Sequence, residues 1–398
     1  MKAKIKIFGE VDQRALAQIE RCSKEADFAV LCADHHVGYS MPIGGAAAYK
    51  NFISPSGVGF DIACGNKAVK TNLLAKDIEI IKTMDEIVRR ISFGIGRINN
   101  EPASHPVLDK IAETDFKPQK NMAKLASEQL GTVGSGNHYV DLFSDEEGVL
   151  WIGVHFGSRG FGHKTAMGFL ALARGLGFGE KPRDADAMDA PPTLLDIYSE
   201  LGQDYLQAMS LAGEYAYAGR DMVVKKVLEI LGAESVFEVH NHHNFAWFEE
   251  HFGKKYWVIR KGCTPAFPGQ QSFIGSTMAG TSYIIEGVDT EEAKISLYST
   301  IHGAGRVMSR TKAAGKRKWK HGKMIHVTRG EINFKQVKEE LKQKGIVLRG
   351  GGADEAPEVY KNLNEVINYH QNTIKILYRL KPIGVAMAGE DVFDPYID

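Results

Sequence analysis

The chain has 398 residues, of which 43% are hydrophobic and 25% are charged, and both values are ordinary for a globular enzyme. Its 49 Lys and Arg residues balance 49 Asp and Glu residues, which argues against a generally basic surface but leaves room for a local basic groove. The four cysteines show no CxxC pairing, and no segment approaches the roughly 18–20 apolar residues of a membrane span. We therefore expect a soluble, cytoplasmic protein without a secretory signal and without a membrane partner.

The predicted helices and strands are interspersed irregularly along the chain. In chain order, the patterns predict a helix over 12–24 with Asp12 as its N-cap, a strand over 28–34, a glycine-rich loop region over 34–65, a helix over 74–91, a strand over 149–155, a surface segment over 178–193, a helix over 193–231, strands over 235–240, 254–262 and 281–287, and helices over 333–345 and 364–378. This mixture predicts an α+β fold, with residues 1–398 forming a single large layered domain of mixed β-sheets, surrounding helices and a metal site at strand ends.

The loop over 54–65, SPSGVGFDIACG, places Asp61 and Cys64 three residues apart on constrained backbone. Several predicted strands and turns are followed by histidines, namely His138, His155, His240, His242, His243 and His302. A strand end fixes the position of an imidazole, and one thiolate can bridge two cations. Taken singly, each histidine is more often a hydrogen-bonded structural residue, and Cys64 a small buried apolar one. The joint pattern is harder to dismiss, and such a set could hold two metal ions, but ligands scattered over about 240 residues lack the local spacing of a zinc finger.

Two further segments indicate phosphate chemistry. His302 begins the motif HGAGR, which ends in Arg306, and an imidazole can attack phosphorus while an arginine neutralises phosphate oxygens. A turn that starts a helix is an equally good interpretation of this motif. The basic run over 311–323 could follow a nucleic acid backbone, although such runs are usually solvated loops.

Together these segments resemble the RtcB family of RNA ligases. The resemblance is carried by a series of motifs in family order: ADHHVGYSMPIGG, GTVGSGNHYVD, HFGSRG, HHNFAW, RKGCTPAFPG, STMAGTSYIIEG, HGAGRVMSR and DEAPEVYKNLNEVI. It implies an enzyme that joins RNA 3′-phosphate or 2′,3′-cyclic phosphate ends to 5′-hydroxyl ends in tRNA splicing or RNA repair. The implied cofactors are GTP and two Mn²⁺ ions, the implied intermediate is a guanylylated histidine, and an archease-like helper protein is a conceivable partner.

The resemblance also implies roles for individual residues. Cys64 would bridge the two Mn²⁺ ions, and the remaining metal ligands would be Asp61 and His138 for one ion and His155 and His243 for the other. His240 is the alternative to His243, because it too precedes an asparagine. The catalytic residues would be His302, which takes GMP from GTP, and Asp34, which orients it. The nucleotide-binding residues would be Asn137, Asp141, Ser282, Tyr283, His302 and Arg306.

Three departures from the family pattern concern the nucleotide. Asp141 stands where the family has Glu, the segment GSTMA over 275–279 lacks the family's proline, and Met387 stands where the family has a Lys that contacts the nucleotide. We therefore expect weakened selectivity for guanine. The alternative is a divergent member that acts as a metal-dependent phosphodiesterase or as an RNA-binding protein without ligation, but the retained His302 favours nucleotidyl transfer.

Overall fold

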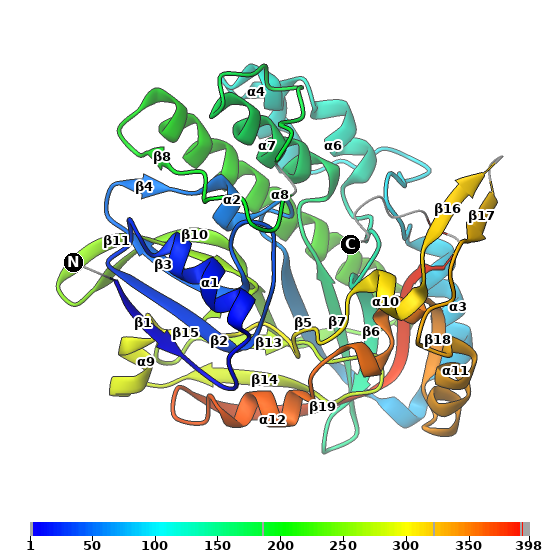
Figure 1. The fold of residues 1–398 in the computed structure, drawn as a ribbon. Helices are drawn as coiled ribbons and strands as arrows, with labels where there is room; N and C mark the ends of the chain where they lie inside the picture. Colours follow the sequence, from blue (N-terminus) through cyan, green and yellow to red (C-terminus); the bar gives the residue numbers. More distant parts are fainter. Residues whose placement is uncertain (1–2, 185–186, 321–322, 391, 393–398) are drawn as a thin grey trace.

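The computed structural model describes residues 3–184, 187–320, 323–390 and 392, which build two large sheets (Figure 1). Within these residues the first sheet has five strands, in the order β1 (Lys4–Ile7), β2 (Phe28–His36), β3 (Ile43–Tyr49), β11 (Lys254–Lys261) and β10 (Asn244–His251). The second has eight, in the order β13 (Gln271–Ile274), β14 (Ser282–Gly287), β19 (Ile374–Gly389), β6 (Tyr139–Ser144), β7 (Val149–Phe156), β5 (Gly65–Leu74) and β9 (Ser235–His242), with β18 (Val347–Gly351) also paired to β19. Parallel and antiparallel pairs both occur, and helices surround the sheets, so the expected α+β class is confirmed.

The remaining elements are helices and short strands. The helices are α1 (Gln13–Cys22), α2 (Pro55–Val58), α3 (Ile80–Arg90), α4 (Pro106–Glu113), α5 (Lys117–Lys120), α6 (Ala123–Gln129), α7 (Arg159–Leu172), α8 (Glu200–Leu231), α9 (Glu291–Ile295), α10 (Arg310–Ala314), α11 (Phe334–Gln343) and α12 (Leu363–Asn368). The short strands are β4 (Phe52–Ile53), β8 (Leu195–Asp196), β12 (Cys263–Pro265), β15 (Ser299–Ile301), β16 (Arg317–Lys320) and β17 (Lys323–His326). None of the helices described is long and apolar enough to cross a membrane.

Local signals in the sequence account for several of these elements. Asp12 caps α1 as predicted, because its carboxylate accepts the backbone N–H of Arg14 at 2.8 Å and that of Ala15 at 3.2 Å. The long helix α8 begins where the Ser199 hydroxyl accepts a backbone N–H at 3.0 Å, and it ends at Gly232, which has a left-handed φ of 62°. The expected helix over 193–231 therefore exists, but it begins at residue 200.

Two sequence predictions are wrong. The region 34–65 is not mainly loop, because IGGAAAY forms β3 between β2 and β11. Glycine and alanine have low strand propensity, but here small side chains let neighbouring strands pack closely, and most of β3 is buried. Of the helix predicted over 364–378, only the part that belongs to α12 is helical, because the chain becomes strand β19 at Ile374. This apolar run lies between β14 and β6, where backbone pairing overrides helical spacing.

Candidate active site

The turn that carries Asp61 and Cys64 is built by local capping and by close strand approach. Ser54 caps α2 by accepting a backbone N–H at 3.0 Å, and the Cys64 N–H donates to the backbone oxygen of Asp61 at 3.1 Å. Strand β5 begins at Gly65, where a Cβ atom would lie 2.2 Å from the backbone oxygen of Asn241 in β9. Glycine is therefore needed at this point, and the turn holds Cys64 where β5 meets the end of β9.

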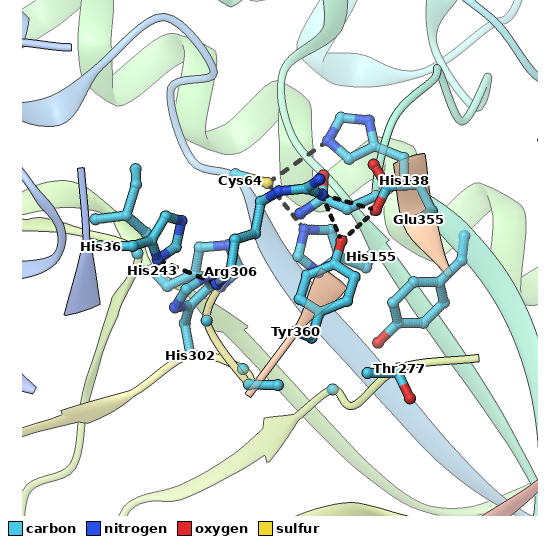
Figure 2. A pocket seen from close by; sticks show the side chains of 18 of the residues that line it. His36, Cys64, His138, His155, His243, Thr277, His302, Arg306, Glu355 and Tyr360 are labelled. Atoms are coloured by element: carbon cyan, nitrogen blue, oxygen red, sulfur yellow. Dashed lines mark hydrogen bonds and ion pairs between the residues drawn. The ribbon is translucent and has the colours of Figure 1, made fainter. Parts of the chain in front are cut away.

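Cys64 belongs to two groups of side chains that could each hold a metal ion. One group is Cys64, His155 and His243 and the other is Asp61, Cys64 and His138, and in each the ligand atoms lie within 4.8 Å of one another. The Cys64 sulfur lies 3.3 Å from Nε2 of His155 and 3.7 Å from Nε2 of His138 (Figure 2). Nε2 of His138 also lies 3.1 Å from the Asp61 carboxylate. One sulfur atom thus faces two adjacent sets of donors.

The histidines present free nitrogen atoms to this cluster. Nδ1 of His138 donates to the backbone oxygen of Val133 at 3.1 Å, so Nε2 is the nitrogen that faces both the Cys64 sulfur and the Asp61 carboxylate, and a bound metal ion would displace any proton from it. The backbone N–H of His243 donates to the Cys64 carbonyl at 2.9 Å, and its Nδ1 is buried without a hydrogen-bond partner among the described residues. Buried polar atoms normally have a partner, and a metal ion would provide one here.

The electrostatics of the cluster also fit a cation. Burial lowers the pKa of His155 and that of His243 well below the usual value, so both rings are neutral. Burial alone would raise the pKa of Asp61, but the hydrogen bond and charge of His138 outweigh it and lower that pKa to about 2. Burial and the charge of Asp61 raise the pKa of Cys64 well above its usual value. A bound metal ion reverses this last effect, because a coordinating thiol is deprotonated. Thiolate, imidazole and carboxylate together are a donor set that suits transition metals.

His240 and His242 lie on the other side of this junction, away from the Cys64 sulfur. Nε2 of His240 accepts a hydrogen bond from Arg220 at 2.8 Å, and Nδ1 of His242 accepts another at 3.0 Å. Of the three histidines in this motif, His243 is the one grouped with Cys64.

The structure brings His302 and Asp34 together although they are far apart in the sequence. Asp34, in β2, is fully buried, and its Oδ2 accepts hydrogen bonds from Nδ1 of His302 at 2.7 Å and from the His302 backbone N–H at 2.9 Å. Burial would raise the pKa of Asp34, but the charge and hydrogen bonds of His302 outweigh it and lower that pKa. The ionised carboxylate keeps a proton on Nδ1, so Nε2 of His302 carries the lone pair. The rings of His302 and His243 lie 4.9 Å apart between centroids (Figure 2).

The two groups of potential ligands, which together we call the Cys64 cluster, consist of Asp61, Cys64, His138, His155 and His243. One cavity of about 330 Å³ is lined by this cluster and by His302. Among the expected nucleotide-binding residues, Asn137, Asp141 and Arg306 line this cavity, as does Met387. Asp141 is buried and its Oδ1 has no hydrogen-bond partner among the described residues.

Ser282 and Tyr283 are placed differently from the other expected nucleotide-binding residues. They lie on β14 outside the lining of the cavity. The Ser282 hydroxyl accepts the backbone N–H of Ser276 at 3.0 Å, and the Tyr283 hydroxyl donates to Asn364. Their contact with a nucleotide stays a prediction, and the hydroxyl groups already have protein partners.

Sequence reasoning missed several side chains that shape the cavity. Nη1 of Arg306 donates to the Tyr360 hydroxyl at 3.2 Å, and this hydroxyl in turn donates to Glu355 (Figure 2). His36 lines the cavity beside His302 and Arg306. The signal was present in the motifs ADHH and DEAPEVYK, which carry these residues, but neither motif has a spacing that predicts contact with HGAGR.

The basic run over 311–323 includes strand β16 and the first residue of β17, and the hairpin of these strands projects from the body of the molecule (Figure 1). Residues 321–322 of the run lie outside the described part of the chain. Arg317 faces inward: its side chain is 8% exposed, and its guanidinium lies 3.4 Å from the Asp354 carboxylate and 3.3 Å from the Glu390 carbonyl. Lys316 and Lys318 are exposed. Arg317 therefore anchors the hairpin, and the neighbouring lysines are the groups that solvent and ligands can reach.

Comparisons with known proteins identify the family of the chain. A family model described as tRNA-splicing ligase RtcB matches residues 15–388. The tRNA-splicing ligase RtcB of Archaeoglobus fulgidus is 34% identical over 89% of this chain and 86% of its own length. The corresponding protein of Aeropyrum pernix is 30% identical over 90% and 87%, and the RNA-splicing ligase RtcB homolog 2 of Entamoeba dispar is 31% identical over 88% and 78%. These matches define the class of protein as an enzyme of the ligase type. The chain belongs to the RtcB family.

Proposed function

We propose that this protein is a GTP- and Mn²⁺-dependent RNA ligase that acts in tRNA splicing or RNA repair. It joins RNA 3′-phosphate or 2′,3′-cyclic phosphate ends to 5′-hydroxyl ends through a guanylylated His302. One observation carries this proposal. His302, oriented by Asp34, lines the same cavity as the Cys64 cluster, and the centroid of its ring lies 4.9 Å from that of His243. Membership of the RtcB family supports RNA as the substrate. An archease-like helper protein remains a conceivable partner, as the resemblance implied.

Five side chains would hold the metal ions. Cys64 would bridge two ions, with Asp61 and His138 on one and His155 and His243 on the other, as the two groups of ligand atoms suggest. When bound, the ions supply positive charge against the triphosphate and an activated water that opens a cyclic phosphate. The choice of manganese rests on the family, because thiolate and imidazole also suit zinc, copper and iron.

The first chemical step is carried by His302. Its Nε2 attacks the α-phosphorus of GTP, a P–N bond forms, and the bond to the β-phosphate oxygen breaks to release pyrophosphate. Asp34 keeps the proton on Nδ1 and stabilises the positive charge that the ring gains during the attack. Asn137 and Arg306 line the cavity, where they would contact the phosphate oxygens.

The second and third steps act on RNA. The 3′-phosphate of RNA takes GMP from His302, and the P–N bond breaks, which returns Nε2 to its neutral form. The 5′-hydroxyl of the second RNA end then attacks the activated phosphate, and GMP leaves. Asp34 holds the same tautomer of His302 throughout, so the ring is ready for another GTP.

A metal-dependent phosphodiesterase, or an RNA-binding protein without ligation, is the second candidate function. A phosphodiesterase would retain the Cys64 cluster. Neither it nor an RNA-binding protein would require an imidazole held by a buried carboxylate. The 2.7 Å hydrogen bond between His302 and Asp34 favours nucleotidyl transfer, because it leaves a nucleophilic nitrogen facing the cavity.

Trapping of a covalent intermediate tests the proposed function. The protein is incubated with Mn²⁺ and α-labelled GTP and then denatured, and a parallel reaction receives RNA with a 3′-phosphate and RNA with a 5′-hydroxyl. We expect acid-labile label on the protein and joined RNA in the parallel reaction. Cleavage of RNA phosphates without labelled protein would support the phosphodiesterase instead.

We predict that Met387→Lys increases the preference for GTP over ATP. Met387 lies on β19 opposite Tyr139 and lines the cavity, where it can pack on a base but cannot donate to guanine O6. A hydrogen bond to a charged donor is typically worth about 1.5–3 kcal/mol, so the preference should rise by roughly ten- to hundredfold. Adduct formation with GTP and with ATP, measured across nucleotide concentrations, gives the preference.

The effect of Asp141 on the pH dependence of GTP use is an independent test of the same pocket. Burial raises the pKa of Asp141 well above the usual value, so the neutral carboxyl, which accepts hydrogen bonds from guanine N–H groups poorly, persists to higher pH than it does in an ordinary aspartate. GTP use should therefore improve as pH rises through this raised pKa, and Asp141→Asn should remove that improvement. If Met387→Lys leaves the preference for GTP over ATP unchanged, this view of the pocket is contradicted. The measurement is repeated on a variant that ends at Gly389, so that the acidic tail cannot compensate for the substitution.

We predict that the β16–β17 hairpin helps to hold RNA. Replacing Lys316, Lys318 and Lys320 with alanine should weaken RNA binding, and the slope of log affinity against log salt should fall by about 0.7 for each RNA phosphate that the variant no longer neutralises. The matched control replaces three lysines of the α11 region, Lys335, Lys342 and Lys344, which are exposed and change the net charge equally. Equal slopes for the two triple variants would show that the hairpin is only a solvated loop.

A further inference from the structure

Arg220 lies within α8, has no exposed surface and contacts three separate segments. Its Nη1 donates to the backbone oxygens of Ala63 at 3.0 Å and Phe156 at 2.6 Å. Its Nε donates to Nε2 of His240 at 2.8 Å, and its Nη2 donates to Nδ1 of His242 at 3.0 Å. One planar guanidinium therefore ties the turn before β5, the end of β7 and the end of β9 to a single helix.

Each of these three segments carries a member of the Cys64 cluster one residue away from its contact with Arg220. The three adjoining ligands are Cys64, His155 and His243. They are the three that form one of the two groups of ligand atoms within 4.8 Å. Arg220 itself does not enter the cluster, and it does not line the cavity. Its hydrogen bonds thus act on the backbone and neighbours of the ligands.

The chemistry of these contacts makes the arrangement rigid. A guanidinium only donates hydrogen bonds, so the nitrogens of His240 and His242 that face it carry no proton. His240 then carries its proton on Nδ1, which lies 3.4 Å from the Asp221 carboxylate. Tyr217, one turn earlier on α8, packs against His240 with the two rings tilted by 46° and their centroids 3.9 Å apart. The orientations of Arg220 and of both imidazoles are therefore mutually determined.

We propose that Arg220 is a positioning residue for the metal pair, an inference that rests on the proposed function. It holds the segments of Cys64, His155 and His243 at the spacing that the ions require before the ions bind. Without the guanidinium, these segments keep the strand pairing of β5 with β7 and β9 and the backbone hydrogen bonds of Ala63 to Asn244 and of His243 to Cys64, but they lose the group that joins all three segments at once. Groups that support metal ligands from outside typically contribute 10- to 100-fold in metal affinity.

The test compares two buried arginines. Arg220→Lys keeps the charge but loses the planar fork, so Mn²⁺ affinity, measured by calorimetric titration without nucleotide, should fall by about 10- to 100-fold. Electron paramagnetic resonance should show the coupled signal of two ions in the original protein and signals of isolated ions in the variant. The control, Arg260→Lys, alters a second arginine with no exposed surface, whose guanidinium binds Glu249 and Ser299 and adjoins no ligand of the cluster. It should lose similar thermal stability but keep its Mn²⁺ affinity.

The possible outcomes separate this inference from the proposed function. Unchanged Mn²⁺ affinity in Arg220→Lys, or equal losses in both arginine variants, would overturn the positioning role. If Arg220→Lys does not fold, His240→Phe removes the acceptor of Nε while keeping a ring, and it should still weaken Mn²⁺ binding several-fold; unchanged affinity there would overturn the role as well. A failure of the original protein to bind Mn²⁺ would instead contradict the proposed function.

Discussion

Replacement of Cys64 by serine should abolish binding of the metal pair. The Cys64 sulfur belongs to both groups of potential ligands, and it lies 3.3 Å and 3.7 Å from Nε2 of His155 and of His138. A neutral hydroxyl is a far poorer ligand than a thiolate, so both ions lose a donor through one substitution. The loss should exceed the roughly 10- to 100-fold that follows removal of a merely supporting group. Metal analysis after gel filtration in Mn²⁺ measures the number of ions retained.

Cys22→Ser is the matched control for this experiment. Cys22 is also a buried free cysteine, but its sulfur faces the backbone oxygen of Ser40 at 3.8 Å and it belongs to neither group of ligands. The control variant should therefore retain the same number of ions as the original protein. Two Mn²⁺ ions per chain in Cys64→Ser would show that the sulfur does not bridge them.

Replacement of His302 by alanine should eliminate the covalent nucleotide adduct and RNA ligation while the metal ions remain bound. His302 lies outside both groups of metal ligands, and its ring is held by Asp34 through a 2.7 Å hydrogen bond. His138 also pairs with a carboxylate in this cavity, that of Asp61, but both belong to a group of potential metal ligands, which leaves His302 as the imidazole that we expect to act as nucleophile. Denaturing gels after incubation with α-labelled GTP detect the adduct, and metal analysis confirms that the cluster is intact.

Replacement of Asp34 by asparagine should slow the formation of the nucleotide adduct without eliminating it. An amide of the same shape preserves packing but no longer enforces the proton on Nδ1 of His302, so the nucleophilic tautomer becomes rarer. In a serine protease the analogous change lowers kcat by about 10⁴-fold, and we expect adduct formation to slow by several orders of magnitude here. Labelled adduct at the original rate in His302→Ala would place the nucleophile on another residue.

The types of residue in the site could be predicted from the sequence, because local backbone signals accompany them. Gly305 of HGAGR has a φ of 78°, and a Cβ atom there would lie 2.1 Å from the backbone oxygen of Asp34. A side chain at this position would therefore push apart the two segments that carry Asp34 and His302. Motifs of this kind indicate a close approach of backbone, but they do not reveal which segment approaches.

The choice of His243 among the neighbouring histidines rested on the family motif and not on the spacing of the residues. His240 and His242 alternate along β9 and so face the same side, where Arg220 binds both. His243 follows the end of β9, and its backbone N–H bonds to the carbonyl of Cys64. The direction of each side chain depends on where the strand ends, and pairing with β5 determines that point. Sequence spacing alone leaves His240 and His243 equivalent.

By itself, the sequence determined which chemical groups this protein has, where α1 begins and α8 ends, and which glycine-rich turns must bend sharply, since capping and positive φ depend on nearby residues. Only the tertiary structure decided that IGGAAAY is a central strand, that the run after Asn368 becomes β19, and that Arg317 faces inward. These outcomes depend on partners far along the chain, because strand pairing and burial outweigh local propensity. The same is true of the site, where Asp34 and His302 meet although they are 268 residues apart.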